Sequence, residues 1–174
     1  LTDSQYFGGS LDFLKKARPL VDKPILRKDF VVDEYQLFEA RLAGADAVLL
    51  IAADLKLQEA RALASMAHEL GLEVLMELHS EDELDYASLD VDMVGVNNRD
   101  LGTFHTDVQN SFRLSASLPQ DRVLVSESGL GNPQTVMLLR QAGFRGFLMG
   151  EHFMKADDPG MELARFISGI GNTL

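Results

Sequence analysis

The strongest constraint on the fold of this chain is a repeating alternation of short apolar runs with amphipathic stretches. Six runs of five to seven residues carry few charges, as do strands that are buried on both faces of a parallel sheet. They are Pro24–Phe30, Ala47–Ala52, Glu73–Leu78, Met93–Asn97, Arg122–Ser126 and Gly146–Gly150. Because a buried helix usually needs about ten or more residues, the length of these runs favours strands.

Helical patterns lie between the runs. Residues 57–70 place apolar side chains every three or four positions, and Gly71 follows as a C-cap. Asn132 before Pro133 is typical of an N-cap followed by the first helical residue. Further helices are predicted over 10–20, 33–44, 81–89, 108–118 and 159–170.

The resulting order is one helix followed by six βα units, which indicates an α/β fold. The glycine-rich phosphate loop of many doubly wound sheets does not occur in the sequence. Polar residues instead follow most of the runs, and an α/β barrel keeps its functional groups at the carboxyl ends of its strands. We therefore predict one domain over residues 1–174 that is part of a TIM (β/α)8 barrel, since eight units typically need about 250 residues.

Charge and composition exclude several classes of protein. The 27 acidic and 16 basic residues give a formal net charge of −11, which argues against a nucleic-acid-coating protein and against binding to anionic membranes. No run is long enough for a transmembrane helix, and we expect no signal peptide. With no cysteine and no helical pair of histidines four residues apart, no metal site is predicted. A cytoplasmic location fits this composition.

The first two candidate catalytic residues end apolar runs. A protonated Lys28 can act as a general acid toward a carbonyl oxygen, and a neutral one can form a Schiff base. The alternative is an ion pair with Asp29 at the rim of the sheet. Glu77 directly follows Val74–Met76, where a carboxylate is costly to bury without partners. It is either an acid–base group or lysine partner, or a satisfied rim charge.

The fourth run ends in Asn97, which shares strand parity with Gly95 and can point inward to donate or accept a hydrogen bond. Arg99 follows together with Asp100. Such a pair more often braces a loop than binds a substrate, but Arg99 remains a candidate substrate-binding or phosphate-binding residue.

The fifth run leads into Glu127, Ser128 and Gly129, which begin a loop before the predicted helix. Exposed backbone N–H groups in such a loop can hold an anion. Gly150 permits close backbone approach after the sixth run, and the last two loops of these barrels commonly hold phosphate. The alternative is that these glycines are simply turn residues.

These motifs, in this order, resemble the indole-3-glycerol phosphate synthase family, (β/α)8-barrel enzymes of tryptophan biosynthesis. The Lys-Asp-Phe, Asn-Asn-Arg-Asp-Leu and Glu-Ser-Gly elements are specific together, although each alone is weak. The likeness runs through essentially the whole chain. The matching segments are 1–3, 6–10, 24–30, 45–51, the strand ending at Glu77, 95–101, 126–129 and 146–150.

The resemblance implies a carbon–carbon lyase, a carboxy-lyase that uses no cofactor. Its substrate would be 1-(2-carboxyphenylamino)-1-deoxyribulose 5-phosphate, whose indole ring closes with loss of carbon dioxide and water. Lys28 matches the lysine that acts as acid on the carbonyl oxygen, and Glu77 matches a carboxylate of the dehydration. Asn97 and Glu127 match groups that position the substrate hydroxyls and the lysines.

The remaining matches concern substrate binding. Ser128, Gly129 and Gly150 match positions around the phosphate, and Phe30 and Leu49 would line an apolar pocket for the aromatic ring. Glu151 departs from the family, which often has a serine there. A carboxylate beside a phosphate dianion is repulsive, so only the backbone N–H of Glu151 is expected to bind.

The larger departure concerns what precedes Leu1. On this likeness the chain covers strands three to eight, without the first two strands, a second catalytic lysine or the N-terminal cap helix, and we expect it to be poorly active alone. One alternative is another phosphosugar-binding barrel enzyme such as phosphoribosylanthranilate isomerase, although its chemistry would want a cysteine–aspartate pair. The other is a non-catalytic barrel fragment that self-associates through open sheet edges.

Overall fold

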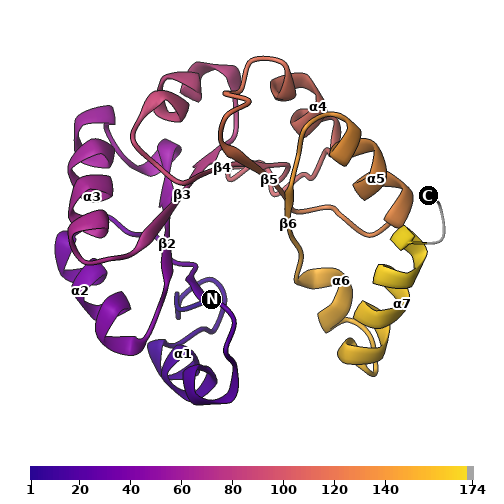
Figure 1. Cartoon of the computed structure of the whole chain (residues 1–174), viewed down its shortest axis with the longest axis horizontal. Helices are drawn as coiled ribbons and strands as arrows, with labels where there is room; N and C mark the ends of the chain where they lie inside the picture. The colour runs from indigo at the N-terminus through magenta and orange to yellow at the C-terminus, as the bar shows by residue number, and fades with distance from the viewer. Residues whose placement is uncertain (172–174) are drawn as a thin grey trace. The chain divides into compact units, whose positions relative to one another are not determined.

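The computed structural model describes residues 1–171, and its elements follow one another in the predicted alternation (Figure 1). The strands are β1 Leu26–Arg27, β2 Ala47–Ile51, β3 Glu73–Leu78, β4 Met93–Asn97, β5 Val123–Glu127 and β6 Gly146–Leu148. The α-helices are α1 Leu11–Ala17, α2 Glu34–Ala43, α3 Leu57–Glu69, α4 Gln109–Ser115, α5 Pro133–Gln141, α6 Glu151–Met154 and α7 Pro159–Gly171. The 3-10 helices are η1 Arg18–Leu20, η2 Ala52–Asp54 and η3 Glu81–Ser88.

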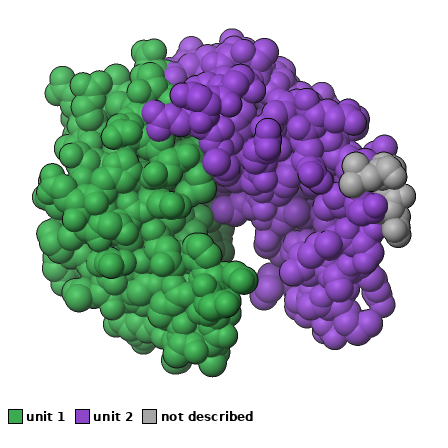
Figure 2. Space-filling model, viewed as in Figure 1, with its two compact units in different colours: residues 1–78, 85–94 green, residues 79–84, 95–174 purple. Residues whose placement is uncertain are grey.

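Two compact units divide the chain (Figure 2). Unit 1 comprises residues 1–78 and 85–94, and unit 2 comprises residues 79–84 and those from 95 onward. Hydrogen bonding orders the strands β1-β2-β3-β4-β5-β6, so strands that are consecutive in the chain are neighbours in the sheet. Because β4 begins in unit 1 and ends in unit 2, each unit has its own stretch of sheet.

In unit 1 the strands β1, β2 and β3 pair in parallel, with a register that runs from Ala47 beside Glu73 to Ile51 beside Glu77. Every residue of β2 is buried, and so is every residue of β3 after Glu73. Helices α2 and α3 pack on this sheet through buried residues such as Leu37 and Leu63 (Figure 1). Near-continuous burial is what a parallel sheet covered by helices requires.

In unit 2 the strands β5 and β6 are also parallel, with Val125 beside Gly146. Helix α5 begins where the sequence predicts, because the Asn132 side chain accepts a hydrogen bond from the Gln134 N–H and Pro133 occupies the first turn. Asp33 caps α2 in the same way in unit 1. These caps fix where the chain leaves each loop at the carboxyl end of a strand.

Two predicted strands are shorter than expected, and the helix predicted over 81–89 is present but of the 3-10 type. The first strand has only two residues rather than seven, and the Asp29 carboxylate there bonds the Phe30 N–H and the Arg27 guanidinium instead of continuing the ladder. Strand β6 ends at Leu148, and Gly150 is the N-cap of a short helix α6 that the sequence analysis missed. Residues 81–88 form a 3-10 helix rather than an α-helix.

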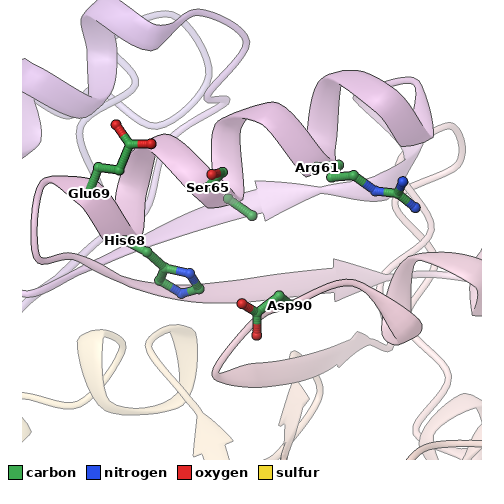
Figure 3. Close-up of a pocket in the computed structure, with 6 residues that line it drawn as sticks. Arg61, Ser65, His68, Glu69 and Asp90 are labelled. Carbon is green, nitrogen blue, oxygen red and sulfur yellow. The ribbon is translucent and has the colours of Figure 1, made fainter.

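A surface hollow of about 500 Å³ lies on α3 in unit 1, beside Asp90 (Figure 3). Its lining includes Arg61, His68, Glu69 and Asp90. In Figure 3 the side chains of Arg61 and Glu69 point in different directions, so these charges do not converge on a ligand. Among the described residues, no helix is long and apolar enough to cross a membrane.

Asp92 ties together three segments of unit 1. Its carboxylate accepts the Val74 N–H at 2.8 Å and lies 2.9 Å from the His68 imidazole. Burial alone would raise the pKa of Asp92, but the Val74 N–H and His68 outweigh that effect and hold the pKa below its usual value. A carboxyl whose pKa is lowered by folding stabilises the protein above its unfolded pKa, and this stabilisation is lost as the pH falls.

We therefore predict that Asp92→Asn lowers the free energy of unfolding by about 1 kcal/mol at pH 7, because it removes a charged acceptor from two hydrogen bonds. The difference from the parent protein should shrink as the pH falls below the unfolded pKa of about 4 and then through the lower pKa that Asp92 has in the folded protein. Urea unfolding at pH 7 and pH 3 measures both values. Glu69→Gln, on the exposed face of α3, is the control and should change neither. A difference as large at pH 3 as at pH 7 would contradict the linkage.

Candidate active site

Lys28 and Glu77 form the centre of the site in unit 1. The Lys28 ammonium lies 2.8 Å from the Glu77 carboxylate, and the two side chains are 22% and 1% exposed. Lys28 follows β1 directly and Glu77 is the fifth residue of β3, so the parallel pairing brings both to the carboxyl side of the sheet. Of the two readings left open by the sequence, Glu77 is therefore a lysine partner.

Asp29 has a different partner from the predicted one. Its carboxylate lies 3.0 Å from the Arg27 guanidinium, which is itself buried and also bonds Gln36 and Glu39 from α2. The Thr2 hydroxyl donates to the same carboxylate at 2.7 Å. The sequence analysis did not identify Arg27, although an arginine inside an apolar run is a signal that such a brace exists.

Phe30 and Leu49 occupy different environments. Phe30 is half-buried and stacks edge-on against Tyr6, with ring centroids 6.1 Å apart. Leu49 is 1% exposed in the middle of β2. Their assignment to the aromatic pocket remains a prediction.

In unit 2 the carboxyl ends of β4 and β5 carry Asn97 and Glu127, which are both buried. The Asn97 side-chain oxygen accepts the Arg99 N–H at 3.0 Å. The Asn110 side chain donates to the backbone oxygens of Asn97 and of His79, so α4 holds the end of β4 in place.

Arg99 and Glu151 form a pair that the sequence analysis did not foresee. Their side chains are 2.5 Å apart, and Lys155 contacts the other Glu151 oxygen at 2.6 Å. Lys155 and then Arg99 hold the pKa of Glu151 below its usual value, so its carboxyl is negative at neutral pH. The carboxylate is thus turned toward two cations, which fits the expectation that only the backbone of Glu151 faces an anion.

Ser128 and Gly129 have left-handed backbones, with φ of 67° and 72°. A Cβ at Gly129 would lie 2.5 Å from the Thr106 methyl, so glycine is required there both by conformation and by space. Gly129 and Gly150 are exposed, at the carboxyl ends of neighbouring strands β5 and β6. Two of the positions expected to hold phosphate are therefore at the surface, whereas the Ser128 N–H donates to the Leu148 backbone oxygen at 3.5 Å.

Within residues 1–171 no group of three or more histidine or acidic side chains could hold a metal ion. The site chemistry consists of a half-buried ammonium paired with a buried carboxylate in one unit and, in the other, a buried amide, a buried carboxylate and a loop with exposed glycines.

Comparison with known proteins decides the family. The sequence model of the indole-3-glycerol phosphate synthase family matches residues 1–166. This chain belongs to the indole-3-glycerol phosphate synthase family. Among curated members, the protein of Bacteroides thetaiotaomicron is 62% identical over 170 residues and that of a Polaromonas species (strain JS666) is 49% identical over 166 residues. The matches cover 98% and 95% of this chain but 65% and 63% of those relatives, respectively.

Solved structures confirm the predicted α/β-barrel fold class. A mutant tryptophan synthase alpha-subunit from Pyrococcus furiosus matches 94% of this chain and 72% of its own, with a TM-score of 0.70 and 16% identity. KGPDC from Streptococcus mutans matches 94% of this chain and 79% of its own, with a TM-score of 0.73 and 14% identity. At such identities the likeness concerns the fold alone.

The Lys28–Glu77 pair yields a stability prediction. Lys28→Met should lower the free energy of unfolding by about 3 kcal/mol, because it takes the ammonium away from a buried carboxylate. The double variant Lys28→Met/Glu77→Gln should recover at least about 1 kcal/mol of that loss. Urea denaturation of the four proteins of this cycle measures the coupling.

The control for this cycle is Lys155→Met, which breaks an ion pair whose lysine is 74% exposed. It should leave the free energy of unfolding nearly unchanged. A double variant whose loss of stability equals the sum of the losses of the two single variants would show that the pair is not coupled.

Proposed function

We propose that this chain supplies part of the active site for the reaction of its family, the ring closure and decarboxylation of 1-(2-carboxyphenylamino)-1-deoxyribulose 5-phosphate to indole-3-glycerol phosphate. It would be a carbon–carbon lyase of tryptophan biosynthesis that acts in the cytoplasm without a cofactor. The observation that carries the proposal is the ion pair of the half-buried Lys28 with the buried Glu77 at the carboxyl side of the sheet, in a chain 62% identical to a curated family member.

The pair suits the first half of this reaction. Ring closure places negative charge on the carbonyl oxygen of the open sugar, and a proton donor stabilises that charge. An ammonium 2.8 Å from a carboxylate is held in a fixed direction, so Lys28 is the proposed proton donor. Glu77 is proposed to exchange protons in the dehydration that follows loss of carbon dioxide.

Unit 2 is proposed to bind the rest of the substrate. Asn97 and Glu127 would position the sugar hydroxyls, and the N–H groups around Ser128, Gly129 and Gly150 would bind the phosphate. The Glu151 backbone would join them, with Arg99 near the same phosphate. The Arg99–Glu151 ion pair supports this role because it offsets the negative charge of the Glu151 carboxylate, which would otherwise repel a phosphate.

The other predicted partners and alternatives remain open to direct measurement. A phosphorylated small molecule is the proposed ligand, and nucleic acid and membranes are not. Self-association through open sheet edges remains a prediction, and light scattering on the purified chain would test it. An isomerase acting on a phosphosugar is disfavoured by the absence of cysteine.

A chimera provides the test of activity. The part of the Bacteroides thetaiotaomicron relative that precedes its match would be joined to Leu1, because the resemblance places a second catalytic lysine there. We expect the chimera to form indole-3-glycerol phosphate, detected by indole fluorescence, and the chain alone to show little turnover. Lys28→Met in the chimera should reduce kcat by about 10²- to 10⁴-fold, since it removes the general acid.

Lys16→Met, at an exposed lysine of α1, is the matched control and should leave kcat unchanged. A folded chimera without turnover would overturn the proposed function. Full activity of the Lys28→Met chimera would overturn the assignment of the acid.

A further inference from the structure

Asn98, next to the candidate Asn97, is the centre of a buried hydrogen-bond network in unit 2. The residue is 3% exposed. Its backbone N–H donates to the backbone oxygen of Glu127 at 2.9 Å, and its own backbone oxygen accepts the Asp107 N–H at 2.8 Å. Asn98 therefore joins the ends of two neighbouring strands to the loop that follows β4.

The Asn98 side chain extends the network to both sides. Its oxygen accepts the Ser111 N–H at 3.1 Å and the Ser111 hydroxyl at 2.8 Å. Its amide nitrogen donates to the Ser126 hydroxyl at 3.2 Å and to the Ser128 backbone oxygen at 3.1 Å. Because a backbone N–H can only donate and a backbone oxygen can only accept, these partners fix which way the amide points.

The bond to Ser128 reaches the loop that is proposed to bind phosphate. Ser128 has a left-handed backbone, which is unfavourable for a residue with a Cβ, and such backbones persist where surrounding contacts impose them. Gly129 continues in the same conformation. The Asn98 amide holds the carbonyl that precedes the Gly129 N–H, so it governs the direction of that N–H.

We propose that Asn98 is a positioning residue that holds the Ser128–Gly129 backbone in the conformation that binds the substrate phosphate. Asn98 does not itself touch the anion. The inference rests on the proposed function for the identity of the ligand, but the conformational part of it can be tested separately.

The decisive variant is Asn98→Asp, which keeps the size of the side chain and the acceptor for Ser111. It replaces the amide donor with a carboxylate oxygen that faces the Ser128 carbonyl. Titration of the labelled chain with inorganic phosphate, followed by amide resonances, gives the affinity at Ser128 and Gly129. We expect binding about tenfold weaker than in the parent, as one lost buried hydrogen bond implies.

Ser126→Ala is the matched control, because Ser126 is fully buried in the same network. Its hydroxyl bonds the Asn98 amide and the Ser111 hydroxyl, whereas the bond to the Ser128 oxygen comes from Asn98. Ser126→Ala should lower the melting temperature as Asn98→Asp does, yet keep phosphate affinity within about twofold of the parent. An equal loss of affinity in both variants would mean general destabilisation and would overturn the proposal. Parent-like binding by Asn98→Asp, with unmoved Ser128 and Gly129 resonances, would overturn it too.

Two further outcomes remain decisive. If Asn98→Asp does not fold, the side-chain amide resonance of Asn98 in the parent should move on phosphate addition together with Gly129, and an unmoved resonance counts against the proposal. If the parent binds no phosphate, the proposed phosphate site fails. The positioning role is then judged by whether Asn98→Asp shifts the Ser128 and Gly129 resonances and accelerates their hydrogen exchange.

Discussion

Parallel strand pairing is the constraint on which the rest of this structure depends. Parallel neighbours end at the same edge, so the residues that follow each strand gather there whatever their separation in sequence. Lys28 and Glu77 are 49 positions apart in the chain and meet at 2.8 Å in unit 1. In unit 2, the same geometry places the loops after β5 and β6 side by side. Neither unit needs an elaborate loop to bring polar groups together.

The parts of the fold that could be predicted are those encoded locally. Apolar runs, helical periodicity and the caps Asp33 and Asn132 depend on neighbours within a few residues, and the structure confirms them. The two-residue β1 could not be predicted, because the ladder ends where Asp29 bonds the Arg27 guanidinium and the Phe30 N–H rather than where apolar character ends. Helix α6 has only four residues, too few for a periodic signal.

The choice of partners within the site could not be read from the sequence. Lys28 has a carboxylate next to it in the chain, but Asp29 bonds the Arg27 guanidinium, and the partner of Lys28 is Glu77, 49 positions away. The alternation of side chains along a strand separates Asn97 from Asn98. Both residues are asparagines, so residue type alone could not tell them apart. Only the fold shows that Asn98 is the buried centre of a hydrogen-bond network. The functional assignment of the candidate residues still depends on resemblance and awaits the chimera.

The close approach of Thr106 to Gly129 limits which substitutions the two loops that carry them can accept. The Thr106 methyl occupies the space that any side chain at 129 would need, and Thr106 also pairs with Arg99 across an antiparallel bridge. The loops after β4 and β5 therefore cannot be remodelled one at a time. An engineer who wishes to graft a new specificity onto either loop must transplant both as a matched pair, and natural variation at these two positions should be correlated rather than independent.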